Sequence, residues 1–224
     1  MKNATTPLAP CTRHRAAKGV LLAALVSLTA CSTTLQAVRP VVYDFGPGAL
    51  TAPAPRANPF AAKALINSDI RTGAALDSTA VQYRLAYVDA LQLKPYAQAR
   101  WSMTPAELIR QRLRDQLGLR HTLLSAGEGG LTGAGAHHTL SVDLEEFSQL
   151  FETPGQSVGL LRLRATLALT RPGGERQLAQ RSIVLQRAAP SADASGGVRA
   201  LTAAADAAAQ EIDQWLASLI DTAR

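Results

Sequence analysis

Residues 161–170 read LRLRATLALT, and this stretch indicates the fold more clearly than any other part of the chain. From position 161 to position 169, every second residue is Leu or Ala, and most of the residues between them are Arg or Thr. Such alternation is typical of a β-strand with one buried and one solvated face. Residues 172–174 (PGG) form a turn signal, and a second strand-like run follows at Leu178–Gln186. The two runs predict an antiparallel hairpin.

Further strand-like runs occupy much of the chain before this hairpin. They are rich in β-branched, aromatic and leucine residues, and Gly or Pro ends several of them. Tyr83, Leu85 and Tyr87 are expected to share one sheet face, Pro95 indicates an edge or a bulge, and the break in alternation at Glu145 predicts a bulge. The predicted strands are Val41–Phe45, Phe60–Arg71, Thr79–Val88, Leu91–Trp101, Leu119–Leu124, Leu140–Phe147 and the two strands of the hairpin.

A helix is predicted to begin after Thr104. Thr104 is the expected N-cap, Pro105 occupies the first helical position, and Glu107 completes a capping box. The apolar stripe continues to Leu117, and Gly118 is the expected C-cap. The arginines of this helix, Arg110, Arg112 and Arg114, are expected to face solvent.

A second long helix is predicted near the carboxyl end. Apolar residues recur at helical spacing from Val198 to Leu219, after a polar stretch from Ser191 to Gly197. Strands, a helix, strands and a helix in this order argue for an α+β fold, mainly an antiparallel sheet with two principal helices packed on it. Each half ends in a helix, which suggests two similar halves, although no residue-level repeat supports a duplication.

The amino-terminal segment has the order of a secretory signal. Basic residues precede an apolar run from Val20 to Leu28, which is far too short to span a bilayer. Residues 28–31 (LTAC) resemble the bacterial lipobox, in which the cysteine receives a diacylglycerol before cleavage. We therefore expect residues 1–30 to be a lipoprotein signal peptide, residues 31–40 a lipidated tether and residues 41–224 a single domain. An ordinary secretory signal with a chance cysteine is the alternative.

Removal of the signal changes the charge and thiol content of the chain. Four basic residues leave with it, so the formal charge falls from +6 to +2, and the case for a nucleic-acid partner weakens. Cys11 is also removed and Cys31 carries lipid, so no disulfide and no thiol chemistry are expected in the exported domain. No cofactor is expected beyond the diacylglycerol and N-acyl chains on Cys31. In bacterial lipoproteins an aspartate directly after the lipidated cysteine commonly causes retention in the inner membrane. Position 32 is a serine, which favours a location at the periplasmic face of the outer membrane.

The sequence contains few candidate catalytic or metal-binding motifs. His137 and His138 precede Asp143, Glu145 and Glu146, but neighbours on a strand point to opposite faces, so a metal site is not predicted. The glycine-rich loop at 127–135 lacks the features of a nucleotide-binding motif, and no Gly-x-Ser-x-Gly elbow occurs. We expect no enzymatic activity; a periplasmic hydrolase using His121 or His138 is the least favoured alternative.

Several short motifs resemble one known family. They are YRLAY at 83–87, LKPY at 93–96, ARW at 99–101, PAEL at 105–108, RL at 112–113 and the earlier YDFG at 43–46. Together with the lipobox and the closing helix, they resemble the ABC-type transport auxiliary lipoprotein family, which includes the lipoprotein of the paraquat-inducible system. The resemblance implies an outer-membrane lipoprotein that meets the periplasmic MCE (mammalian cell entry) component of an inner-membrane lipid transporter. It also implies a homo-oligomer and contact with phospholipid.

A protein of this kind acts by binding, and one cluster of residues suits a contact surface. Tyr87, Tyr96, Arg100 and Trp101 lie at the end of a predicted edge strand, and Tyr, Trp and Arg are enriched at interface hot spots. The alternative for Trp101 is a core aromatic that seats the helix after Thr104. A second functional hypothesis is a scaffold or assembly lipoprotein of another envelope complex.

Overall fold

The computed structural model describes residues 39–48, 64–124, 137–171 and 173–220. Its contacts divide the chain into two units, Met1–Arg39 and Pro40–Arg224. The predicted signal peptide, lipobox and most of the tether lie outside the described residues, as do the beginning of the strand expected at Phe60 and the glycine-rich loop. The fold below is that of the second unit.

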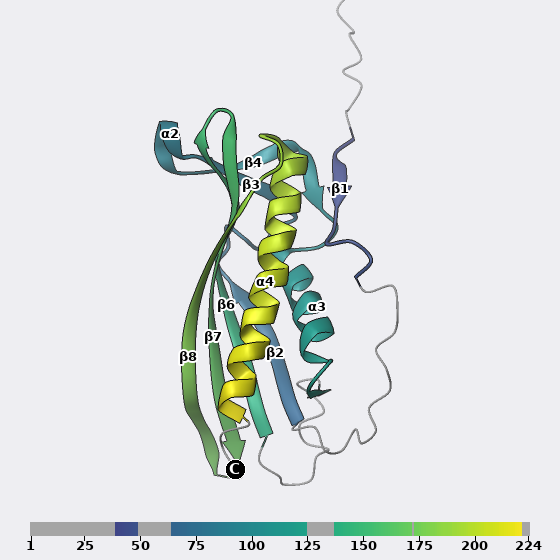
Figure 1. The fold of residues 1–224 in the computed structure, drawn as a ribbon, viewed down its shortest axis with the longest axis vertical. Coiled ribbons are helices and arrows are strands. Elements are labelled where there is room, and N and C mark those ends of the chain that lie inside the picture. Colours follow the sequence, from purple (N-terminus) through teal and green to yellow (C-terminus); the bar gives the residue numbers. More distant parts are fainter. Residues whose placement is uncertain (1–38, 49–63, 125–136, 172, 221–224) are drawn as a thin grey trace, which may run out of the picture. The chain divides into compact units, whose positions relative to one another are not determined.

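The described elements form an α+β domain with one eight-stranded sheet (Figure 1). The mainly antiparallel character predicted from the sequence is confirmed. In chain order the elements are β1 (Val41–Tyr43), β2 (Ala64–Thr72), β3 (Ala80–Leu85), α2 (Ala86–Asp89), β4 (Ala90–Trp101), α3 (Pro105–Leu117), β5 (Thr122–Leu124), β6 (His137–Thr153), β7 (Gln156–Arg171), β8 (Gly174–Ala188) and α4 (Ala194–Ile220).

β6, β7 and β8 are the longest strands of the sheet. β7 pairs antiparallel with both β6 and β8, so the hairpin predicted from residues 161–186 is confirmed. Along its other edge β6 pairs with two strands. β2 pairs with the first part of β6, up to Leu144, and β3 pairs with the last part, from Gln149. The register shift predicted near Glu145 lies between these two pairings. The bulge therefore lies where the strand paired with β6 along this edge changes from β2 to β3.

Several neighbouring strands are parallel, which the sequence pattern did not indicate. β1 runs parallel to β4, β2 runs parallel to both β5 and β6, and β3 runs parallel to the last part of β6. Because these strands join through chain crossovers and not through tight turns, local turn signals carry no information about their direction. Both suggested halves of the chain contribute to this one sheet.

Both long helices cover one face of the sheet. α4 packs along β6, β7 and β8, and α3 lies between α4 and β2 (Figure 1). Two glycines allow the close approach of α4, because a Cβ on Gly159 would come within 2.6 Å of the α4 backbone and one on Gly197 would overlap the Gln149 side chain. The opposite face of the hairpin is polar, and Arg162 and Arg164 form ion pairs there with Glu145. This one-sided burial is typical of an antiparallel sheet with one solvated face.

Several predicted boundaries are wrong. β6 runs from His137 to Thr153, well beyond the predicted Leu140–Phe147, and three other boundaries differ for local reasons. The strand expected at Thr79–Val88 ends at Leu85, since Ala86–Asp89 form a helical turn that reverses the chain into β4, so Tyr87 does not share a face with Tyr83. Helix α4 begins at Ala194, before the predicted Val198, because the Asp193 carboxylate accepts a hydrogen bond from the Gly196 N–H at 2.7 Å. The strand expected at Leu119–Leu124 is shortened to β5 because residues 119–121 continue the hydrogen-bonded turn after α3.

Candidate functional site

The segment Tyr43–Gly48, called the entry segment below, comprises the last residue of β1 and the five residues that follow it. The Asp44 carboxylate accepts a hydrogen bond from the Gly46 N–H at 2.7 Å, which makes a local turn. Gly46 and Gly48 have φ angles of 77° and 68°, in the left-handed region that favours glycine. The sequence Asp-Phe-Gly thus bends the chain so that the intervening Phe45 points inward.

Phe45 enters an aromatic cluster in the core. Its ring meets Trp101 edge-on with centroids 5.7 Å apart, and Phe147 lies 6.1 Å from Phe45 and 5.6 Å from Trp101. Edge-to-face and tilted contacts at such distances are favourable for aromatic pairs. The cluster joins the entry segment to β4 and β6.

Arg112 of α3 holds the entry segment from the other side. Its Nη2 donates to the Phe45 carbonyl oxygen at 2.6 Å, and its Nε lies 2.9 Å from the Asp206 carboxylate of α4. The guanidinium carbon also lies 5.8 Å from the centre of the Phe45 ring, within cation–π range. The expectation that Arg112 faces solvent is therefore wrong, since only 18% of its side chain is exposed.

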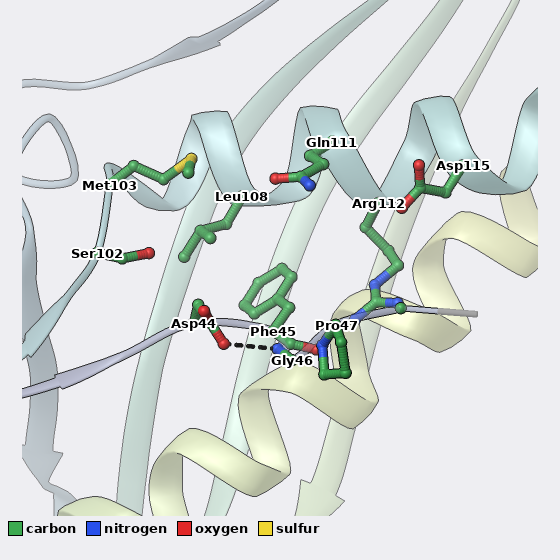
Figure 2. A pocket seen from close by; sticks show the side chains of 11 residues that line it. Asp44, Phe45, Gly46, Pro47, Ser102, Met103, Leu108, Gln111, Arg112 and Asp115 are labelled. Carbon is green, nitrogen blue, oxygen red and sulfur yellow. Dashed lines mark hydrogen bonds between the residues drawn. The ribbon is translucent and has the colours of Figure 1, made fainter. Parts of the chain in front are cut away.

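A shallow pocket of about 200 Å³ lies between the entry segment and α3 (Figure 2). Asp44, Ser102, Gln111 and Asp115 supply polar groups to its wall, and Arg112 closes one side. Phe45, Met103 and Leu108 add apolar surface, so the wall is mixed. The pocket is smaller than typical sites for drug-sized ligands. It can accept a small polar group or a short piece of a partner chain.

In the structure the four residues predicted to form a contact surface do not lie together on one surface. Trp101 is 2% exposed and belongs to the core, which is the alternative left open by the sequence. Arg100 is half-buried, and its Nη1 donates to the carbonyl oxygens of Tyr96 at 2.7 Å and Ala99 at 3.1 Å. Tyr87 is exposed, on α2. Arg100 and Trp101 are adjacent on β4, but they face opposite directions because strand neighbours alternate.

Tyr96 takes part in a half-buried polar network. Its hydroxyl donates to Gln149 Oε1 at 2.8 Å, and the Gln149 amide donates to Ser157 Oγ at 2.7 Å. Burial, followed by the neighbouring Tyr83, raises the pKa of the Tyr96 hydroxyl well above its usual value. The hydroxyl therefore remains a neutral hydrogen-bond donor, and the network links β4, β6 and β7.

Sequence reasoning missed the role of Arg112 and its partner Asp206. The two residues are far apart in the chain and belong to different helices, so no local pattern joins them. The one signal in the sequence was the spacing of Arg112 on α3, one turn after the buried Leu108. That spacing places Arg112 beside the buried stripe, where an arginine can cover apolar surface with its stem.

The acidic and histidine residues do not form a metal centre within the described part of the chain. No group of three or more His, Cys, Asp or Glu side chains comes together there in a way that could hold an ion. His121 is buried with its Nε2 3.9 Å from the Asp213 carboxylate, and Arg120 lies 3.3 Å from the same carboxylate. These residues join the end of α3 to α4.

None of the helices among the described residues is both long enough and apolar enough to cross a bilayer.

The fold and the entry segment define an α+β domain with two helices on one face of a branched sheet. The model of the ABC-type transport auxiliary lipoprotein component family matches residues 49–213. The chain belongs to this family, as the sequence motifs indicated. It is accordingly an auxiliary lipoprotein component of ABC-type transport, with a membrane-anchored location in the cell envelope.

Solved structures share the fold. A crystal structure of a protein from Xanthomonas campestris is 14% identical and has a TM-score of 0.59, with 84% of this chain and 91% of that chain covered. The structure of an uncharacterized protein is 15% identical, with a TM-score of 0.54 and 80% of this chain and 99% of that chain covered. No curated protein sequence matches the chain. At these identities the likeness is one of fold.

Proposed function

We propose that this protein is the lipid-anchored auxiliary subunit of an MCE-associated lipid transport system. In this proposal the acyl chains on Cys31 hold it at the periplasmic face of the outer membrane. The domain docks the periplasmic MCE component, without catalysis of its own. The observation that carries the proposal is the family match over residues 49–213, together with the lipobox ending at Cys31.

The edge of the sheet at β1 is the surface that we assign to the partner. Among the described strands β1 pairs with β4 alone, so its other edge presents backbone groups that an extended segment can pair with. Val41 and Val42 are exposed on this strand, and Arg100 lies opposite Val42 in the register. Of the four nominated residues, Arg100 and Trp101 lie opposite β1 in the register, and Trp101 is buried in the core.

Site-specific crosslinking tests the assignment. A photoreactive amino acid at Val42 is expected to crosslink to the MCE component in intact cells. Val184 on β8 provides a matched control, because its exposure of 59% is close to the 64% of Val42 and its strand lies at a different edge of the sheet. Equal crosslinking from both positions, or crosslinking from Val184 alone, would contradict the assigned surface.

Affinity purification separates the proposal from the scaffold alternative. The intact lipoprotein, extracted from membranes with mild detergent, is expected to carry the MCE component and phospholipid with it. Recovery of a different envelope complex without these partners would favour a scaffold or assembly lipoprotein. Mass spectrometry of bound proteins and lipids in the same sample makes this distinction.

A further inference from the structure

The turn between β3 and β4 exposes an unusual amount of apolar surface. Tyr87, Val88 and Leu91 are 46%, 66% and 91% exposed. Residues 86–91, called the tip below, comprise α2 and the first two residues of β4. Figure 1 shows α2 at the end of the sheet where β6 and β7 are joined. The three exposed apolar side chains lie within five consecutive residues.

The tip is held in place by a network of hydrogen bonds. Arg84 Nη1 donates to the carbonyl oxygens of Ala90 at 3.2 Å and Leu91 at 3.3 Å. Glu146 holds the same guanidinium at 2.9 Å, in an ion pair that is mostly buried. The Asp89 carboxylate accepts from the Leu91 N–H at 2.9 Å. Leu91 is therefore presented to solvent by a fixed turn that extends from the bulge of β6.

The direction of β1 relates this tip to the lipid anchor. β1 runs parallel to β4, with Val41 opposite Ala99, so the chain enters the domain from the direction of the tip. Along β4 the eight steps from Leu91 to Ala99 span at most about 26 Å at roughly 3.3 Å per residue, because the strand bulges between Pro95 and Arg100. The ten residues Cys31–Pro40 can reach about 33 Å when extended. A lipid on Cys31 can therefore lie in the same bilayer surface that the tip touches.

We propose that the tip inserts Tyr87, Val88 and Leu91 into the headgroup region of the bilayer that holds the Cys31 lipid. This inference rests on the lipidation of Cys31 in the proposed function. Val and Leu favour the boundary with the acyl chains, and Tyr favours the membrane–water interface. The charged side chains nearest to these in the chain are Asp89, whose carboxylate accepts from the Leu91 N–H, and Arg84, which is paired with Glu146. Glu152 lies at the same end of the sheet, one residue after Phe151, the strand partner of Leu85. In this proposal insertion is driven by apolar contact and does not require anionic lipid.

A membrane contact at the tip fixes the orientation of the domain. A single lipid anchor on a ten-residue tether leaves the domain free to rotate, whereas a second contact defines which side faces the periplasm. With the tip on the bilayer, the far ends of β7 and β8 and the carboxyl end of α3 point away from the membrane (Figure 1). The β1 edge, offset along β4 from the tip, is left beside the membrane and open to a partner.

Fluorescence quenching in vesicles tests the contact. The full lipoprotein is reconstituted into vesicles of phosphatidylethanolamine and phosphatidylglycerol with an NBD fluorophore on Leu91→Cys. Cys11 leaves with the signal and Cys31 carries lipid, so the new thiol is the one available for labelling. Leu119→Cys is the matched control, because Leu119 is also exposed and comes two residues after the end of α3. The carboxyl end of α3 and α2 lie at opposite ends of the sheet (Figure 1).

The expected result is a blue-shifted emission at position 91, loss of most quenching by aqueous iodide, and quenching by spin labels on the lipid chains. The label at position 119 should remain open to iodide. Vesicles of phosphatidylcholine alone should give the same contrast. Both variants should match the melting temperature of the parent protein, because neither parent side chain is buried.

Two results would overturn the proposal. If the protein floats with the vesicles but position 91 stays open to iodide, the anchor is intact and the tip does not touch lipid. If protection at position 91 appears only at high protein density or on addition of the MCE component, the tip binds protein. Failure of the lipoprotein to float with vesicles at all would instead contradict the lipid anchor of the proposed function.

Discussion

At the scale of single residues, Arg112 links three parts of the molecule. It contacts the Phe45 carbonyl, the Phe45 ring and the Asp206 carboxylate at once. Arg112→Ala is expected to destabilise the domain by about 1–2 kcal/mol, because it leaves a buried carbonyl without its donor while the partly exposed Asp206 regains water. Urea unfolding measures the change. Arg114→Ala on the same helix is the control, and an equal loss there would contradict the special role of Arg112.

Trp101 illustrates how a residue type can suggest two roles. Its burial against Phe45 and Phe147 predicts that Trp101→Ala destabilises the domain by about 3–5 kcal/mol. Trp101→Phe should cost much less, since the indole N–H has no hydrogen-bond acceptor in the described structure. Thermal unfolding of the two variants compares them. A stable Trp101→Ala variant with weakened partner binding would instead indicate a surface role.

At the scale of elements, close packing of α4 on the sheet depends on Gly159. A methyl group there would lie about 2.6 Å from the α4 backbone at Ala200 and Leu201, so Gly159→Ala forces helix and strand apart. We expect a loss of about 1–3 kcal/mol, which is typical of overpacking. Gly155→Ala in the turn between β6 and β7 is the control, because nothing lies within 4 Å of its added methyl group. Chemical denaturation of both variants should show the difference.

The capping box of α3 was predicted from sequence and is confirmed. Thr104 Oγ1 accepts from the Glu107 N–H, and the Glu107 carboxylate accepts from the Thr104 N–H at 3.0 Å. This backbone hydrogen bond, followed by the Thr104 hydroxyl, lowers the pKa of Glu107. Its stabilising contribution is therefore present above the unfolded-state pKa and is lost as pH falls through the folded-state value.

Replacement of Thr104 should affect both stability and titration. Thr104→Ala is expected to cost about 1 kcal/mol and to raise the pKa of Glu107 toward its usual value. NMR titration of the Glu107 side chain measures the second effect. Thr104→Ser keeps the hydroxyl and should preserve the low pKa; an unchanged pKa in Thr104→Ala would mean that the backbone hydrogen bond alone sets it.

At the scale of the whole molecule, the proposed function combines a folded domain with a lipid anchor on Cys31. Cys31→Ala is expected to leave the domain folded and to move the protein from the membrane fraction to the soluble periplasm, because the acyl chains supply most of the membrane affinity. Membrane fractionation followed by immunoblotting checks this outcome. Circular dichroism of the released protein serves as the folding control. A Cys31→Ala protein that stays with the outer membrane and supports function would contradict the proposed anchoring.

The sequence predicted those features that depend on neighbouring residues. Alternation in residues 161–186 predicted the β7–β8 hairpin, the interruption at Glu145 predicted the bulge, and Thr104 with Glu107 predicted the start of α3. These signals are local, since a strand face, a bulge and a helix cap each arise from side chains a few residues apart. The order of strands and helices extended this to the α+β class, and the family motifs extended it to an auxiliary role in ABC-type transport.

Only the tertiary structure decided which distant residues meet. It joined Arg112 to Phe45 and Asp206, placed Trp101 in the core, and set β1 parallel to β4. Strand direction and helix partners depend on how the whole chain packs, and no short pattern encodes them. The hydrophobic pattern predicts which face of a strand or helix is buried, but the packing of the entire domain determines which other element covers that face.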